Sequence, residues 1–341
     1  MLFHPWLFSG AVKKTEGQVA EGDIVEIYSS DNRYLATGHF HEGSIKARIF
    51  SFTETTADFS FWKTKLEAAH SLRQRLGLTD NQHTTVYRLV HAEGDGLPGL
   101  VIDIYGDAAV IQTHTRGMNK LVPVFSDALR EIFKGKLSTI YDKSSDALGK
   151  QAIASNPNHF LLGDKPEGIV KENGISFFVN WVEGQKTGFF IDQRENRDLL
   201  RRYVTGKNVL NTFSYSGGFS MYALTAPANL VHSVDSSKKA ADWALHNAEL
   251  NTVTSRHSFF TEDVFDFLKK SDQFYDVIIL DPPAFAKHLS SADKATIGYR
   301  NLNAEGFRRI APGGILFTFS CSQVIDKMLF RKIVFQAAAQ S

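Results

Sequence analysis

A single thiol and a carboxylate follow two apolar segments that the sequence predicts to be neighbouring strands. Cys321 is the only cysteine in 341 residues and comes just after the segment Gly314 to Phe319. Asp281 ends the segment Asp276 to Asp281. A thiolate is a strong nucleophile, and a carboxylate can hold or share a proton of a substrate. The pair therefore predicts a reaction centre, although a free cysteine at a strand end is also an ordinary small buried side chain.

The loop that starts at Asp281 has the composition of a rigid platform for a flat substrate. Pro282 and Pro283 remove two backbone donors and stiffen the chain, and Phe285 supplies an aromatic face. A planar base can stack on such a ring while polar groups bind its edge. We therefore predict that Pro282 and Phe285 contact substrate, whereas a loop that merely ends a strand is the simpler alternative.

A glycine-containing turn and two acidic residues follow the other predicted strands. The segment Asn211 to Gly218 closes the first strand, and its glycines let the backbone approach a ligand closely. It lacks the Gly-x-Gly-x-x-Gly pattern, which argues against a nicotinamide or flavin cofactor. Asp235 and Asp263 end the next two strands. A carboxylate there can bind a ribose hydroxyl or an adenine amino group, or it can cap the following helix.

These strand ends define a predicted cofactor site, because ligands of open α/β sheets bind beyond the carboxyl ends of the strands. The candidate cofactor-binding residues are Asn211, Phe213, Ser214, Tyr215, Gly217, Asp235, Ser236, Asp263, Val264 and Gln193. Arg194 and Lys287 are candidates for substrate contact, with surface charge as the simpler explanation for either one. Gln193 and Arg194 could equally lie on a solvated helix face near a cap at Asp192.

The elements that must position these residues alternate between strands and helices from about residue 185. Apolar strands separated by amphipathic helices predict a parallel, doubly wound α/β sheet. The predicted strands are 208–213, 230–235, 257–260, 276–281 and 314–319. The predicted helices are 219–225, 237–251, 264–270, 291–310 and 325–338.

The first half of the chain reads differently. Residues 1 to about 55 predict a small β-rich module with strands at 22–28, 34–40 and 45–50, and the chain opens without an obvious first strand. Residues 57 to about 85 are predicted to be helical, with an apolar stripe of Phe61, Leu66, Ala69, Leu72 and Leu76 that ends at Gly77. Strands resume at Thr85, 97–103, 108–113 and 139–142, a helix is predicted over 119–133, and 143–166 is predicted to be a loop. Asn173-Gly174 predicts a hairpin between 168–171 and 176–180.

Composition limits the class of protein. The chain is 43% hydrophobic and 22% charged with a net charge of +1, as expected for a globular protein of two or three domains. A charge this small gives no global basic field that would announce a nucleic-acid partner. The sequence has no apolar run of the ~18 residues that a membrane span needs, and its first residues do not resemble a signal peptide. One cysteine cannot form an internal disulfide, which favours a cytoplasmic location.

Taken together, the motifs resemble those of the ribosomal large-subunit (23S) cytosine-5 methyltransferase I family. That family consists of class I S-adenosylmethionine-dependent methyltransferases, and the likeness covers nearly the whole chain. The segments that carry it are His4 to Gly10, Asp95 to Leu100, Gly184 to Arg197, Phe213 to Gly218, Asp281 to Phe285, Gly298 to Asn303 and Ser320 to Ser322.

The resemblance implies a domain order, a cofactor and a partner. Residues 1–56 would form a PUA-like RNA-binding domain lacking its first strand, 57–184 an α+β middle domain, and 185–341 a Rossmann-like methyltransferase domain lacking a final hairpin. This predicts that the chain is a fragment of a longer protein. The implied cofactor is S-adenosylmethionine without a metal, and the implied partner is large-subunit ribosomal RNA. A homodimer is compatible with this assignment, and a membrane is not implied.

Under this resemblance, Cys321 distinguishes two reactions. Methylation of cytosine carbon 5 needs a thiolate to add to carbon 6, whereas an exocyclic amino nitrogen attacks the methyl group directly. Asp281 would then hold the cytosine at N3. Ala284 and Phe285 occupy the loop in which some RNA cytosine-5 enzymes carry a second cysteine, so product release must differ here. The remaining alternative is a non-catalytic RNA-binding or assembly factor, which the intact Asp235, Asp281 and Cys321 disfavour.

Overall fold

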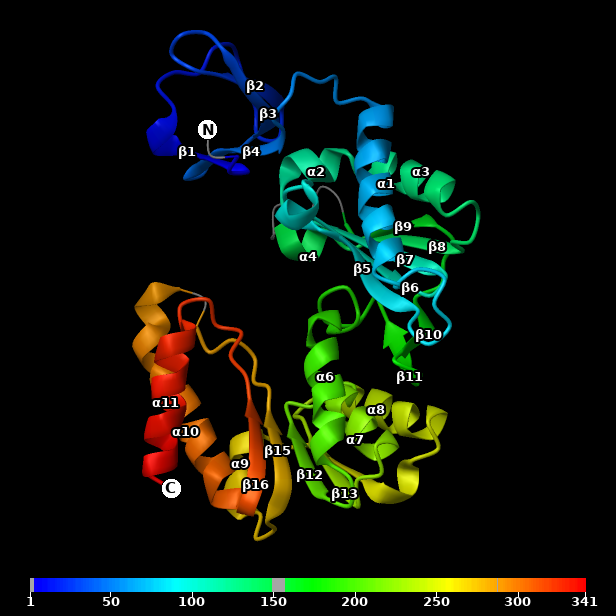
Figure 1. The fold of residues 1–341 in the computed structure, drawn as a ribbon, viewed down its shortest axis with the longest axis vertical. Coiled ribbons are helices and arrows are strands. Elements are labelled where there is room, and N and C mark those ends of the chain that lie inside the picture. Colours follow the sequence, from blue (N-terminus) through cyan, green and yellow to red (C-terminus); the bar gives the residue numbers. More distant parts are fainter. Residues whose placement is uncertain (1–2, 149–156, 287) are drawn as a thin grey trace. The chain divides into compact units, whose positions relative to one another are not determined.

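A computed structural model describes residues 3–148, 157–286 and 288–341 (Figure 1). The chain divides into two compact units, of which the first comprises residues 1–174 and 179–191 and the second 175–178 and 192–341. Within the described ranges, no helix is both long enough and apolar enough to cross a membrane.

The N-terminal part of the first unit is an antiparallel sheet in the order β1-β4-β3-β2. Its strands are β1 (Trp6–Phe8), β2 (Ile24–Tyr28), β3 (Tyr34–Phe40) and β4 (Ile45–Ser51). The predictions for β2 to β4 are confirmed, but the expectation that the chain opens without a strand is wrong. β1 has only three residues, too few for a periodic pattern, and it is defined by its pairing with β4.

A second, mixed sheet in the order β5-β6-β7-β8-β9 forms the rest of the first unit. Its strands are β5 (Val86–His91), β6 (Leu100–Tyr105), β7 (Ala108–Thr113), β8 (Thr139–Asp142) and β9 (His159–Leu162). Its main helices are α1 (Phe59–Arg75), α2 (Arg116–Lys120), α3 (Val122–Ile132) and α4 (Ser145–Leu148). The loop predicted over 143–166 therefore contains α4 and β9, while residues 149–156 lie outside the described ranges.

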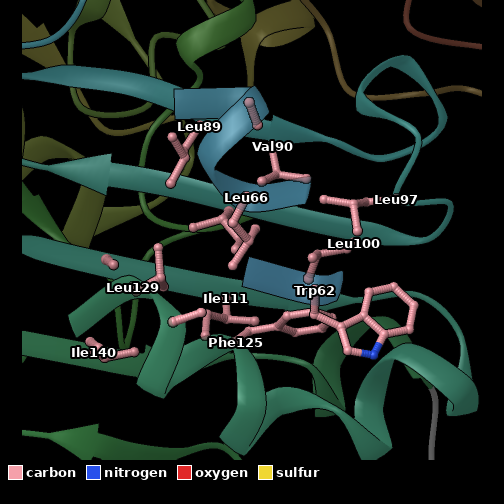
Figure 2. Close-up of a cluster of buried hydrophobic side chains, with 14 of the residues drawn as sticks. Trp62, Leu66, Leu89, Val90, Leu97, Leu100, Ile111, Phe125, Leu129 and Ile140 are labelled. Atoms are coloured by element: carbon pink, nitrogen blue, oxygen red, sulfur yellow. The ribbon is translucent and has the colours of Figure 1, made fainter. Parts of the chain in front are cut away.

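The core of this sheet is packed by α1 and α3 (Figure 2). Trp62 and Leu66 of α1 are fully buried, and Phe125 of α3 lies edge-on to the Trp62 ring. The predicted apolar stripe of α1 is partly wrong, because Leu72 and Leu76 are exposed and Arg73 is buried in their place. Arg73 can be buried because its guanidinium forms an ion pair with Asp95.

The hairpin predicted from Asn173-Gly174 is confirmed. β10 (Glu167–Glu172) and β11 (Ile175–Asn180) form a two-stranded sheet. Asn173 and Gly174 have φ angles of 49° and 83°. Two positive φ angles at the central positions are what a type I′ turn requires, and Asn-Gly tolerates them best.

The second unit contains a five-stranded parallel sheet in the order β14-β13-β12-β15-β16. Its strands are β12 (Asn208–Thr212), β13 (Leu230–Val234), β14 (His257–Phe260), β15 (Tyr275–Leu280) and β16 (Ile310–Thr318). Its helices are α6 (Arg194–Leu200), α7 (Gly218–Thr225), α8 (Lys238–Leu250), α9 (Val264–Lys270), α10 (Ala292–Arg309) and α11 (Lys327–Ala339). The predicted α/β fold is confirmed. Strand order reverses between β12 and β15, which makes their carboxyl ends the topological switch point.

Candidate active site

The turn after β12 has an unusual backbone. Phe213, Tyr215 and Gly217 all have positive φ angles, of 51°, 46° and 78°. A side chain in this region is strained, and such strain is typically retained at ligand-binding sites. Gly217 also lies close to α8, since a Cβ atom on it would stand 3.2 Å from the Cβ of Ala244. The turn is therefore compact and presents its backbone at the switch point.

Asp235 joins this turn to the end of β13. Its carboxylate accepts hydrogen bonds from the Tyr215 amide at 2.9 Å and the Ser237 amide at 3.0 Å. The alternative that Asp235 caps α8 is wrong, because Ser237 is the N-cap and its hydroxyl accepts from the Ala240 amide. Ser236 lies exposed between the two. Two carboxylate oxygens have more lone pairs than these two amides use, so Asp235 can also accept from a ligand.

For Asp263, the structure supplies a capping role. Its carboxylate is the N-cap of α9 and accepts from the amides of Phe265 and Asp266 at 2.8 and 3.2 Å. Val264 is buried in the core of the second unit. The structure thus confirms that Asp263 caps the following helix, and its contact with a ligand remains a proposal.

Asp281 follows β15 and faces a side chain that precedes the sheet in sequence. The Gln193 amide donates to the two Asp281 carboxylate oxygens at 3.3 and 3.2 Å. The Asn196 amide in turn donates to the Gln193 side-chain oxygen at 2.7 Å. Gln193 thus orients Asp281, and its predicted contact with the cofactor stays a prediction. Arg194 begins α6 beside it, and Lys287 lies outside the described residues.

Cys321 lies beside the loop that Asp281 opens. β15 and β16 pair in register up to Leu280 and Thr318, and the Phe319 amide donates to the Leu280 carbonyl at 2.9 Å. Two residues later, the Cys321 thiol stands 3.6 Å from the Pro282 carbonyl oxygen. The alternative of a buried apolar cysteine is wrong, because Cys321 is exposed. The thiol is therefore accessible to a substrate at the end of the sheet.

The ring of Phe285 packs against α10. Its centroid lies 4.6 Å from that of Tyr299, which is fully buried. A Cβ atom on Gly298 would stand 3.0 Å from the Phe285 ring, so glycine permits this close approach. Pro282 and Ala286 are buried on either side of the loop. The predicted platform is thus a packed structure rather than a loose strand end.

Comparison with known proteins decides the family. Residues 156–337 match the S-adenosylmethionine-dependent methyltransferase family, and residues 2–52 match the PUA-like domain. The chain is 40% identical to the ribosomal RNA large subunit methyltransferase I of Aeromonas salmonicida over 98% of its length and 86% of the relative's. For the Aeromonas hydrophila protein of the same name, the identity is 41% with the same coverage. The chain belongs to the ribosomal RNA large subunit methyltransferase I family.

Solved structures of methyltransferases share the fold. One that is complexed with S-adenosylhomocysteine has a TM-score of 0.84 and 25% identity, covering 98% of this chain and 86% of that one. An S-adenosylmethionine-dependent methyltransferase from Streptococcus mutans has a TM-score of 0.82 at 24% identity and covers 98% of this chain and 85% of that one. The cofactor of this methyltransferase family is S-adenosylmethionine.

The residues of the strand ends fit this cofactor. The Ser214 hydroxyl is buried in the turn after β12 and has no hydrogen-bond partner among the described residues. A buried polar atom without a partner is costly, so a ligand atom that bonds to it is favoured. Asp235 offers acceptor oxygens at the adjacent strand end. A polar ligand with hydroxyl and amino groups therefore suits this edge of the sheet.

Asn211, a predicted cofactor-binding residue, is linked by hydrogen bonds to three polar residues that the sequence did not point to. The Asn211 amide donates to Ser220 at 2.9 Å, Ser220 bonds Ser233 at 2.7 Å, and Ser233 bonds His257 Nε2 at 2.7 Å. Asn211 is almost fully buried, so its amino group points under α7 rather than toward solvent. The signal for this chain of bonds was Ser233, a polar residue in a strand whose other buried residues, Val231 and Val234, are apolar.

Proposed function

We propose that this protein methylates carbon 5 of a cytosine in large-subunit ribosomal RNA. The observation that carries the proposal is the exposed Cys321 thiol beside the Asp281 loop at the carboxyl end of the sheet. Methyl transfer to nitrogen needs no thiol, whereas transfer to carbon 5 does. The names of the close relatives support ribosomal RNA of the large subunit as the substrate.

The strand ends would hold the cofactor. The turn from Phe213 to Gly217 and the carboxylate of Asp235 would bind the methionine and ribose portions of S-adenosylmethionine. Asp263, Ser236 and Val264 would line the adenine end. Bound S-adenosylmethionine supplies an electrophilic methyl group, which carbon 5 takes up while the electron pair of the broken bond stays on sulfur.

Cys321 would make carbon 5 able to attack. The thiolate forms a bond to carbon 6, and the electrons of the C5–C6 double bond move to carbon 5. After the methyl group has been added, a base takes up the carbon-5 proton, and the electrons of that C–H bond restore the double bond and expel the thiolate. This divides one difficult step into two easier ones, as covalent catalysis does.

Asp281 would bind the base while charge develops. Its carboxyl group is oriented by the Gln193 amide, so one oxygen can accept from the amino group of the cytosine while the other shares a proton with N3. Pro282 and Phe285 would form the wall against which the flipped base rests. Arg194 and Lys287 would bind the RNA backbone by charge.

The domain organisation supports an RNA substrate. We infer a PUA-like RNA-binding domain over residues 1–56, a middle domain over 57–184 and a methyltransferase domain over 185–341. The PUA-like match over 2–52 supports the first of these. A cytoplasmic location and a homodimer remain expectations of the sequence.

Amino-group methylation of a ribosomal RNA base is the second candidate, since the Asp281 to Phe285 loop would orient an exocyclic nitrogen equally well. RNA containing 5-fluorocytosine distinguishes the two, because fluorine blocks loss of the carbon-5 substituent and leaves the enzyme attached to the RNA. We expect a covalent complex with the wild type and none with Cys321→Ala. If the wild type methylates unmodified RNA but forms no complex with the fluorinated RNA, the carbon-5 proposal is overturned.

A non-catalytic assembly factor is the third alternative. Calorimetric titration with S-adenosylmethionine tests it, with an Asp235→Ala variant as the control for binding at the proposed site. If S-adenosylmethionine binds to the wild type and binds more weakly to this variant, the result supports an enzyme. If it does not bind to the wild type, the enzyme proposal is overturned.

A further inference from the structure

One hydroxyl group connects three segments of the candidate active site. Ser322 follows Cys321 directly and is 3% exposed. Its Oγ accepts a hydrogen bond from the Ala286 amide at 3.2 Å, at the end of the Asp281 loop. The same Oγ lies 2.9 Å from the Tyr299 hydroxyl of α10. The loop, the helix and the segment after β16 therefore meet at one atom.

Tyr299 is itself held in place. It is fully buried, and its ring contacts Phe285 at 4.6 Å and Phe330 of α11 at 5.5 Å between centroids. Its carbonyl oxygen accepts from the Asn303 side-chain amide at 2.8 Å. A phenol in such a packed site has few rotational states, so it can fix the group that it bonds. This accounts for the Gly298 to Asn303 motif, to which the proposed chemistry assigns no role.

Hydrogen-bond capacity shows why both bonds to Ser322 matter. A serine hydroxyl has one proton and two lone pairs, so it can accept from Ala286 and still donate to, or accept from, Tyr299. Without Tyr299, only the bond from the loop amide would remain between these partners. The thiol itself makes a long contact of 3.6 Å to the Pro282 carbonyl, and a thiol is a weak donor. Ser322 is therefore the stronger connection between the Cys321 segment and the loop.

We propose that Tyr299 and Ser322 are positioning residues that hold the Cys321 thiol in register with the Asp281 to Phe285 loop. This inference rests on the proposed role of Cys321 as the nucleophile. The thiol must approach carbon 6 of a base that rests on Phe285 and is bound by Asp281. An error of about 1 Å in such an approach costs on the order of 10²-fold in rate. Because Tyr299 packs on Phe285 and bonds Ser322, it positions both the surface on which the base rests and the segment that carries the thiol.

The test compares two buried tyrosines in the same sheet domain. Tyr299→Phe removes the hydroxyl that bonds Ser322. Tyr275→Phe removes a hydroxyl that lies 2.9 Å from His232 Nδ1 and outside the active site. Each variant removes the hydroxyl of a buried tyrosine together with its hydrogen bonds, so we expect similar falls in melting temperature. We expect Tyr299→Phe and Ser322→Ala to slow covalent attachment to 5-fluorocytosine RNA about 10-fold or more, and Tyr275→Phe to change it less than about twofold.

A merely structural defect is excluded by the kinetic pattern. For Tyr299→Phe, we expect kcat to fall while the KM values for S-adenosylmethionine and RNA stay close to those of the wild type. Because the two residues act through one contact, the double variant should be little slower than the slower single variant. Independent, multiplicative losses or an equal loss in Tyr275→Phe would overturn the proposal.

A second readout needs neither cofactor nor RNA. Cys321 is the only cysteine, so iodoacetamide labelling followed by mass spectrometry reports on it alone. Release of the Cys321 segment from the loop should raise the labelling rate about threefold or more in Tyr299→Phe and Ser322→Ala, but not in Tyr275→Phe. Unchanged labelling in the first two variants would overturn the proposal. If the wild type forms no covalent complex with the fluorinated RNA, the assignment of Cys321 as the nucleophile fails. The labelling rates then decide by themselves whether Tyr299 and Ser322 hold the Cys321 segment against the loop.

Discussion

A buried ion pair in the first unit and the strand ends of the second unit use polar groups in contrasting ways. In the first unit, Asp103 is fully buried, and its two carboxylate oxygens accept from Arg88 at 2.8 and 2.9 Å. Thr187 also donates to Asp103 at 2.6 Å, and the Tyr105 hydroxyl lies 2.8 Å from that of Thr187. A carboxylate with bidentate and hydroxyl donors has little capacity left for a ligand.

A buried lysine extends this pattern. Lys143 is 1% exposed, and its ammonium group donates to the carbonyl oxygens of Trp181, at 2.8 Å, and Gly184. Burial lowers its pKa. Together with Thr187, it holds the beginning of the Gly184 to Arg197 segment on which the family resemblance rested. In the first unit, Asp103 and Lys143 therefore fix the backbone position of this segment.

At the strand ends of the second unit, one buried hydroxyl is left unsatisfied. The Ser214 hydroxyl has no hydrogen-bond partner among the described residues. Strained backbone accompanies it at Phe213 and Tyr215. The comparison teaches that a satisfied buried charge stabilises the fold, whereas an unsatisfied group on a rigid edge leaves a bond for a ligand.

The largest expected effect is on chemistry in the second unit. We expect Cys321→Ala to lower methylation by at least ~10³-fold, because the carbon-5 route requires the thiolate. The fold should be unaffected, since the side chain is exposed. Transfer of a tritiated methyl group to RNA measures the effect, and Cys321→Ser serves as the isosteric control. Methylation at the wild-type rate in either variant would contradict a nucleophilic role.

The next effect concerns stability in the first unit. Asp103→Asn leaves Arg88 facing a neutral amide, and we expect a loss of ~2–4 kcal/mol in the free energy of unfolding. The estimate is below that for a fully buried pair because Arg88 is partly exposed. Denaturant titration measures it, with the surface pair of Lys136 and Asp80 as the matched control. Asp80→Asn should cost less than ~1 kcal/mol, and an equal cost would contradict the distinction.

Asp281→Asn is the counterpart of this variant in the second unit. The amide has nearly the same shape but cannot share a proton with N3 as negative charge develops on the base, so we expect kcat to fall about 10²-fold. The melting temperature should stay near that of the wild type, unlike that of Asp103→Asn. Scanning calorimetry and single-turnover methylation measure the two quantities. A large fall in melting temperature with unchanged kcat would show that Asp281 is structural too.

The smallest expected effect is a pH dependence of stability, to which one buried histidine in each unit contributes. Burial lowers the pKa of His39 in the first unit and of His257 in the second to about 4. The unfolded chain, with its histidine pKa near ~6.5, binds more protons than the folded protein between those values. Stability should therefore fall as the pH is lowered from about 6.5 to 4, by on the order of 1–2 kcal/mol for each histidine.

Denaturant titrations at pH 7 and pH 5 measure this effect. His39→Gln and His257→Gln should each reduce the difference between the two pH values. His4 is exposed, so His4→Gln should leave the difference unchanged. A pH dependence that neither buried-site variant alters would contradict the assignment to these histidines.

Local sequence patterns determined much of this protein. Alternation of strands and helices predicted the parallel sheet, Asn173-Gly174 predicted the hairpin, and residues that follow apolar strands predicted the candidate site. These features depend on periodicity and turn conformation over a few residues, so they can be read without knowing distant contacts. The motifs of the Asp281 loop and of Cys321 are equally local, and they sufficed for the family resemblance.

Other features were decided by contacts between residues far apart in the chain. β1 and β9 exist because β4 and β8 pair with them, and Arg73 is buried because Asp95 neutralises it. The burial of the Asn211 amide likewise depends on Ser220. Above all, the meeting of Ala286, Tyr299 and Ser322 required the strand order, since pairing of β15 with β16 brings their ends together. Periodicity assigns a residue to a face of its element, but only the packed structure selects the partner on the other side.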